Sequence, residues 1–300
     1  MGDRGISNHS EVSDFILVGF KVAPQLHIVL FLLFLLVYTM VLLGNIRIMA
    51  IILTDPRLNT PTYFFLSNLS FIDLFYSSVI APKAMINFWA EKKSISFAGC
   101  VAQVFLFALF IVTEGFVLAA MAYDRFIAIC NPLLSSFPMS TRLCTQGSYF
   151  CGCISSVLQT SRTFTLSFCA SRAIVHFYCD TRALQSLLCS DLFIYKMVTF
   201  SLFGVIILPT IIVYIVSTVL KINSTEGRKK TFSTCSSHLG VVSILHAAMF
   251  FMYLTPDRFS ELSKCYTLVT PMLNPLIYSL RNNDVKEAVK KLLGKKILFF

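Results

Sequence analysis

Long runs of apolar residues recur along the chain, with short polar segments between them. Each run is close to the roughly 20 residues that an α-helix needs to cross the hydrocarbon core of a bilayer. The pattern predicts an all-α integral membrane protein, built as a seven-transmembrane helix bundle. We place the seven spans at 26–53, 58–82, 97–129, 143–161, 194–220, 235–254 and 262–280.

The two ends of the chain have different patterns. Residues 1–25 are mostly polar and are predicted to form an N-terminal tail. Residues 282–300 contain a short amphipathic segment, with Val285 and Val289 on one face and Lys286 and Lys290 opposite, which is typical of a helix lying on a membrane surface. The whole of 1–300 is thus predicted to form one seven-helix domain. The absence of an internal sequence repeat argues against a transporter.

Composition supports the membrane interpretation. Hydrophobic residues make up 56% of the chain, charged residues only 13%, and the mean hydropathy is +0.75. A soluble domain has about a quarter of its residues charged. The net charge of +10 does not indicate nucleic-acid binding, because the positive charge is confined to short loops between the apolar runs.

Charge distribution predicts the orientation. With the N-terminus outside, the inner side carries 14 of the 25 Lys and Arg residues but five of the 15 Asp and Glu residues. Lys and Arg concentrate on the cytoplasmic side of membrane proteins, so an extracellular N-terminus and a cytoplasmic C-terminus follow. The sequon at Asn8 then lies outside and is a predicted glycosylation site.

Four of the ten cysteines fall on the predicted outer side, which is oxidising: Cys100, Cys169, Cys179 and Cys189. Four cysteines predict two disulfides, but they allow three pairings, and arithmetic leaves the choice open. Cys151 and Cys153 have no partner His or Cys at metal-ligand spacing, so no metal site is predicted there.

Two sets of charged residues stand out against the apolar background. Asp124 and Arg125 form an acid–base pair at the inner end of the third span, where either a functional site or an interfacial anchor is expected. Asp73 and Glu114 lie deep within the second and third spans. A buried carboxylate is costly, so these two acids are expected to be protonated or to hold a cation.

Six stretches together carry a resemblance to one family. The stretches are Gly44-Asn45, 61–73, 121–132, 176–180, 230–238 and 271–282. In order and spacing they resemble the olfactory receptors, a branch of the rhodopsin-like G-protein-coupled receptors, in the tetrapod-type class. The chain departs from the family pattern at Thr62, where the family usually has Met.

The resemblance implies roles for matching residues. It selects the pairings Cys100–Cys179 and Cys169–Cys189 among the three that were open. It implies a G-protein switch and a sodium-like ion site, with no other cofactor. The switch residues are Asp124, Arg125, Asn274, Pro275 and Tyr278, and the ion-site residues are Asp73, Glu114 and Asn45.

The resemblance also implies a ligand pocket among the outer halves of the third, fifth, sixth and seventh spans. Its lining is mostly apolar, as a small volatile organic ligand requires. Plain helix packing is the alternative for each residue. The candidates are Phe107, Ala108, Ile111, Val112, His246, Met249, Phe250, Tyr253 and Thr267. No acid stands at Phe107, which disfavours an amine ligand.

The predicted function is that of an odorant receptor in the plasma membrane, which activates a stimulatory, olfactory-type heterotrimeric G protein and raises cAMP. No enzymatic activity is expected. Spans four, five and seven look several residues shorter than the family pattern. A receptor-like chain with impaired trafficking or signalling is therefore the first alternative, and a transporter or channel is the second.

Overall fold

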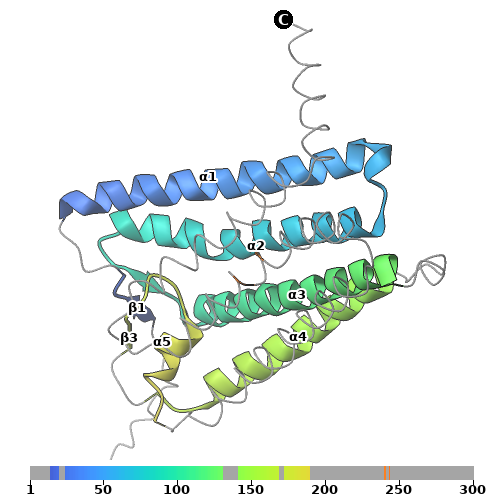
Figure 1. Ribbon diagram of the computed structural model, residues 1–300. Coiled ribbons are helices and arrows are strands. Elements are labelled where there is room, and N and C mark those ends of the chain that lie inside the picture. Colours follow the sequence, from blue (N-terminus) through green and yellow to red (C-terminus); the bar gives the residue numbers. More distant parts are fainter. Residues whose placement is uncertain are drawn as a thin grey trace, which may run out of the picture.

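Four long helices dominate the described part of the chain. The computed structural model describes residues 14–19, 24–130, 141–168 and 172–189, together with Gly240 and Ser243. The helices lie side by side in chain order (Figure 1), each packed against the next. They are α1 (Pro24–Thr54), α2 (Pro61–Trp89), α3 (Phe97–Cys130) and α4 (Thr141–Thr165).

The first three predicted spans are confirmed as membrane-capable helices. Segments Leu26–Thr54, Pro61–Trp89 and Phe97–Asp124 are long and apolar enough to cross a bilayer. The predicted spans 194–220 and 262–280 and the C-terminal helix lie outside the described residues. The same holds for 235–254, apart from the helical Gly240 and Ser243.

The fourth predicted span is also a helix, and it is longer than predicted. α4 has 25 residues. At about 1.5 Å per residue it is roughly 37 Å long, which exceeds the roughly 30 Å of bilayer hydrocarbon. The helix extends at both ends to residues that the apolar run did not include. It is not among the three described helices that are both long and apolar enough to cross a bilayer.

The predicted bounds of the second span, 58–82, are corrected at both ends. Residues Pro56–Leu58 form a separate 3-10 turn, η1, whose preceding Asp55 accepts a hydrogen bond from the Arg57 amide at 3.1 Å. α2 begins at Pro61, where proline's missing N–H costs nothing. It continues through Pro82 to Trp89, because one internal proline does not end a helix packed on both sides.

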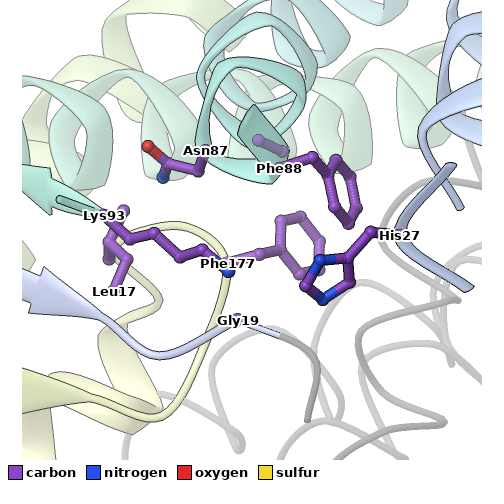
Figure 2. Close-up of a pocket in the computed structure, with 8 residues that line it drawn as sticks. Leu17, Gly19, His27, Asn87, Phe88, Lys93 and Phe177 are labelled. Carbon is purple, nitrogen blue, oxygen red and sulfur yellow. The ribbon is translucent and has the colours of Figure 1, made fainter. Parts of the chain in front are cut away.

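The prediction of an all-α fold misses a small sheet at one end of the bundle. Strand β1 (Phe15–Leu17) pairs antiparallel with β2 (Ser94–Ile95) and parallel with β3 (Ala173–Ile174). Part of the segment predicted as a tail is therefore ordered in a strand. Beside the ends of α1 and α2, β1 borders a small cavity (Figure 2).

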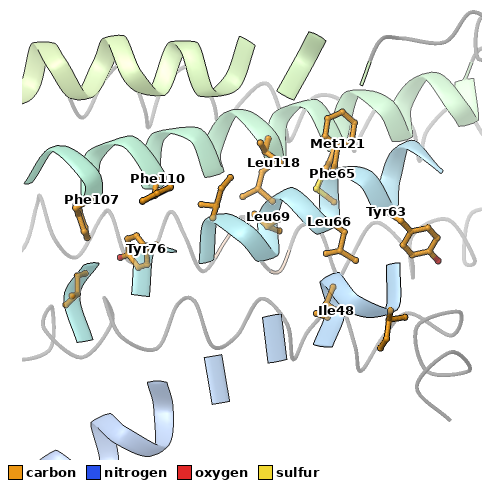
Figure 3. Packing of buried hydrophobic residues seen from close by; sticks show 14 of the residues in the cluster. Ile48, Tyr63, Phe65, Leu66, Leu69, Tyr76, Phe107, Phe110, Leu118 and Met121 are labelled. Carbon is orange, nitrogen blue, oxygen red and sulfur yellow. The ribbon is translucent and has the colours of Figure 1, made fainter. Parts of the chain in front are cut away.

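A large apolar cluster holds α1, α2 and α3 together (Figure 3). Phe65, Leu69 and Ile72 of α2 are at most 1% exposed, and Leu118 of α3 is fully buried against them. α1 instead presents large apolar side chains outward, such as Leu43 at 64% exposed. An apolar outer face of this extent fits contact with lipid.

Small polar residues form the contact between α3 and α4. Ser148, Gly152, Ser156 and Thr160 recur at four-residue spacing on α4 and are buried. A Cβ atom at Gly152 would overlap the Thr113 hydroxyl and lie 3.0 Å from the Leu109 carbonyl oxygen. Small residues let helix backbones approach closely in membranes, which explains why α4 is less apolar than its neighbours.

Candidate functional site

Asp124 lies at the predicted inner end of α3 and is tied to α2. The Thr62 hydroxyl, in the first turn of α2, donates a hydrogen bond to the Asp124 carboxylate at 3.1 Å. Asp124 is partly buried, and the side chain of its neighbour Arg125 lies outside the described residues. The structure thus shows what holds Asp124, the acid of the predicted switch, in place. The sequence marked Thr62 as a departure from the family pattern but did not predict this bond.

Three polar residues of the predicted ion site are buried on consecutive helices. Asn45 is fully buried on α1, Asp73 is 1% exposed on α2 and Glu114 is 2% exposed on α3. Both carboxylates lie within electrostatic range of the buried Tyr76. The helices therefore carry all three residues to the interior rather than to the lipid face.

The fit of a sodium ion to these residues rests on Asn45. Its amide nitrogen donates to the Val41 carbonyl at 3.0 Å, while its oxygen has no hydrogen-bond partner among the described residues. Hard cations prefer oxygen ligands. The unpartnered oxygen of Asn45, together with the carboxylates of Asp73 and Glu114 on the next two helices, therefore suits Na⁺. In the same described ranges no group of three or more His, Cys, Asp or Glu is arranged for a metal ion.

The predicted ligand-pocket residues of α3 are buried but make packing contacts. Phe107 is 8% exposed, and its ring lies 5.2 Å from that of Tyr76 and 5.6 Å from that of Tyr178. Ala108 and Val112 are buried, and Ile111 packs against the main apolar cluster. Phe107 therefore faces α2 and the loop before α5 (Thr181–Gln185), in an aromatic group of three rings.

The predicted disulfide between Cys100 and Cys179 is present, with 5.5 Å between the Cα atoms. It ties the start of α3 to the loop before α5. Cys189 is also disulfide-bonded, while its predicted partner Cys169 lies outside the described residues. Cys151 and Cys153 are free thiols.

Gln103 reinforces this disulfide and was not singled out from the sequence. Its side-chain nitrogen donates to the Val79 carbonyl of α2 at 2.8 Å, and its oxygen accepts from the Cys179 amide at 2.9 Å. The residue is 5% exposed. One side chain thus joins α2, α3 and the loop beside the disulfide.

Asp180 caps α5, directly after the disulfide. Its carboxylate accepts hydrogen bonds from the Ala183 amide at 3.2 Å and from the Tyr178 hydroxyl at 3.3 Å. Burial raises the pKa of Asp180 from its ordinary value of 3.8, although these two bonds and the nearby Arg182 oppose that rise. Desolvation of the charged form is the dominant cause.

The remaining predicted site residues lie outside the described residues, so these predictions stay open. They are Asn8, Cys169, His246, Met249, Phe250, Tyr253, Thr267, Asn274, Pro275 and Tyr278.

The described part of the chain has three features of a multi-pass membrane receptor. Its helices can cross a bilayer, polar residues are buried between them, and a disulfide joins α3 to the loop before α5. The family model described as olfactory receptor matches residues 34–296, which is most of the chain. The class is therefore that of the G-protein-coupled receptors. Within that class, the chain belongs to the olfactory receptor family.

Individual relatives agree over nearly the full length. The chain is 78% identical to human Olfactory receptor 9K2 over 309 aligned positions, covering 99% of this chain and 92% of that one. It is 50% identical to mouse Olfactory receptor 5AP2, with 98% of each chain covered, and 47% identical to mouse Olfactory receptor 5G9.

The human alignment also bears on chain length. It is 309 positions long, whereas this chain has 300 residues, so at least nine aligned positions have no counterpart here. This agrees with the missing residues that the sequence pattern indicated.

Proposed function

We propose that the chain is an odorant receptor, which binds small, mostly apolar organic ligands and activates a stimulatory, olfactory-type heterotrimeric G protein to raise cAMP. The observation that carries the proposal is the match to the olfactory receptor family over residues 34–296. The bond from Thr62 to Asp124 supports it, because it holds the acid of the predicted switch between α2 and α3.

The proposed architecture is a single seven-helix domain over residues 1–300, in the plasma membrane, with an extracellular N-terminus and a cytoplasmic C-terminal helix at 282–300. The disulfide Cys100–Cys179 and the small sheet lie at one end of the described helices, and Asp124 lies toward the other. Disulfides form on the oxidising side of a membrane, so the end with the disulfide is the outer one.

Ligand binding is proposed at the outer half of α3, where Ala108 and Val112 are buried and Ile111 is partly buried. The other residues proposed for the pocket are His246, Met249, Phe250, Tyr253 and Thr267. Phe107 would shape the pocket from one side, since its ring already rests on Tyr76 and Tyr178.

The switch is proposed to rest with Asp124 as acceptor and Arg125 as its charged neighbour. Arg keeps its charge, so it changes place only when other acceptors are offered. Asn274, Pro275 and Tyr278 are proposed to form the bendable element beside it. A sodium ion at Asp73, Glu114 and Asn45 would neutralise the two buried carboxylates.

The test is a cAMP assay on the full chain, expressed at the cell surface with the olfactory G protein and given a broad odorant panel. At least one ligand is expected to raise cAMP. Arg125→Ala should abolish the response, whereas Arg142→Ala, at an exposed position where α4 begins, should keep it.

Two results would replace the proposal with an alternative. Protein that stains at the surface but never raises cAMP would indicate a receptor-like chain that has lost signalling. A ligand-dependent current or flux without G protein would indicate a channel or transporter. Failure to reach the surface, cured by restoring family-length spans, would place the defect in trafficking.

A further inference from the structure

A small, partly open cavity lies at the outer end of the described helices. It sits where α1 begins and α2 ends, beside strand β1, and its volume is about 20 Å³. Leu17, His27, Phe88 and Phe177 form apolar and aromatic walls, and Asn87 and Lys93 supply polar groups (Figure 2). Its described lining contains no residue of the predicted pocket, switch or ion site.

Asn87 is the unusual residue of this cavity. It is 6% exposed, yet neither its amide oxygen nor its amide nitrogen has a hydrogen-bond partner in the described part of the chain. Leaving a buried polar group without a partner costs about 1–3 kcal/mol. Buried amides are almost always satisfied by protein, water or a ligand, so the cavity beside Asn87 is where its partner belongs.

Lys93 reaches the same cavity from the loop between α2 and β2. Figure 2 shows its side chain extending below Asn87 toward Gly19 and Phe177. It is partly buried, and in the described ranges its ammonium group makes no hydrogen bond or ion pair. Its own backbone is fixed, because the Lys93 carbonyl accepts from the Leu17 amide at 2.7 Å.

Among the described residues, the lining contains one full positive charge and no acid. An amide N–H and an ammonium group both donate hydrogen bonds, so together they call for an acceptor that carries negative charge. The aromatic rings of Phe88 and Phe177 lower the local polarity, which strengthens that attraction.

Size limits the acceptor further. A cavity needs about 10–15 Å³ to hold one water molecule, so 20 Å³ admits a single species of that size. Phosphate, sulfate and organic carboxylates are too large. We propose that this cavity binds one monatomic anion, chloride, between the Asn87 amide and the Lys93 ammonium group.

Bound chloride would join the end of α2 to the segment that leads into β2. Asn87 belongs to the last turn of α2, and Lys93 directly precedes β2. Because β2 pairs with β1, the anion would stabilise the sheet together with the end of the helix. The effect is on the stability of the outer end of the receptor and is independent of odorant binding or G-protein coupling.

The test measures the thermal midpoint of the purified full-length protein in chloride, bromide and gluconate salts at equal ionic strength. Chloride and bromide are expected to raise the midpoint by about 2–4 °C over gluconate at concentrations near ten times the dissociation constant. Lys93→Met, which keeps the length of the side chain without its charge, should remove the difference.

Lys92→Met is the matched control, because Lys92 is the exposed neighbour. It should keep the halide effect, and Asn87→Leu should lose it. Equal midpoints in all three salts for the unmodified chain would overturn the proposal. So would an equal loss of the effect in Lys92→Met and Lys93→Met, since that would indicate general charge screening. Line broadening of the chloride-35 signal gives a second readout that does not depend on folding stability. It should be seen with the unmodified protein and be lost with Lys93→Met.

Discussion

The contact between Thr62 and Asp124 joins two residues that are far apart in sequence and meet at one end of the helices. A single hydroxyl at Thr62 supplies this bond, and the Met usual in the family at this position has no hydroxyl to offer. The bond stabilises the arrangement of α2 and α3 seen here. It therefore adds a chain-specific restraint to the predicted switch.

Thr62→Val is expected to raise cAMP in the absence of ligand. Valine matches threonine in shape but cannot donate the hydrogen bond, and a bond of this kind is worth about 1 kcal/mol, or roughly fivefold in a two-state equilibrium. The measurement is ligand-free cAMP normalised to surface staining. Thr62→Ser retains the hydroxyl and should behave like the unmodified chain; similar basal signals for the Val and Ser variants would contradict this role.

Asp180 predicts a pH dependence of stability. Because its pKa is raised in the folded protein, its stabilising contribution is fully present below its ordinary value of 3.8 and is lost as the pH rises through the folded pKa. Asp180→Asn still caps α5 but does not titrate. The thermal midpoint of this variant should therefore rise relative to that of the unmodified chain as the pH rises through the folded pKa.

Parallel profiles for Asp180→Asn and the unmodified chain would show that Asp180 does not titrate differently on folding.

At the scale of elements, the contact between α3 and α4 depends on a missing side chain at Gly152. Gly152→Ala is expected to lower the thermal midpoint, because the added methyl overlaps Thr113 and forces the helices apart at a cost of about 1–3 kcal/mol. Gly147→Ala lies in the same helix with open space around it and should be neutral or stabilising by up to about 1 kcal/mol. Equal midpoints for the two variants would refute close packing at Gly152.

The helices were predictable from the sequence to the extent that they are continuous apolar runs. The ends of α2 were not, because Pro82 stands inside a helix whose last turn lies beyond it. Strands of two or three residues, such as β2, are too short to show an alternating pattern. They form only because the chain brings β1, β2 and β3 together in space.

The candidate site divides in the same way. Buried acids such as Asp73 and Glu114 could be found from the sequence, since a charge within an apolar run is conspicuous. Pairings over long distance could not: the disulfide partner of Cys100 came from the family resemblance. The roles of Gln103 and Thr62 required the structure, because a polar residue near a helix end has no distinctive pattern.

For the whole molecule, the disulfide between Cys100 and Cys179 closes a loop with a sequence separation of 79 residues. Removing a disulfide that closes a loop of this length costs about 4–5 kcal/mol on the chain-entropy estimate. Cys100→Ser should therefore abolish surface staining. Cys153→Ser, at an exposed free thiol, should not. Normal surface levels of the Cys100→Ser protein would show that the outer end folds without this bond.

The position of β1 has a consequence for synthesis. Ile16 pairs with Ala173, so β1 receives its parallel partner only about 160 residues later in synthesis. At roughly 5–20 residues per second, that interval is on the order of 10–30 s. With the N-terminus outside, as proposed, β1 would wait in the secretory lumen during this time with an open strand edge. Chaperones in that compartment would therefore contact β1 before the rest of the receptor has folded.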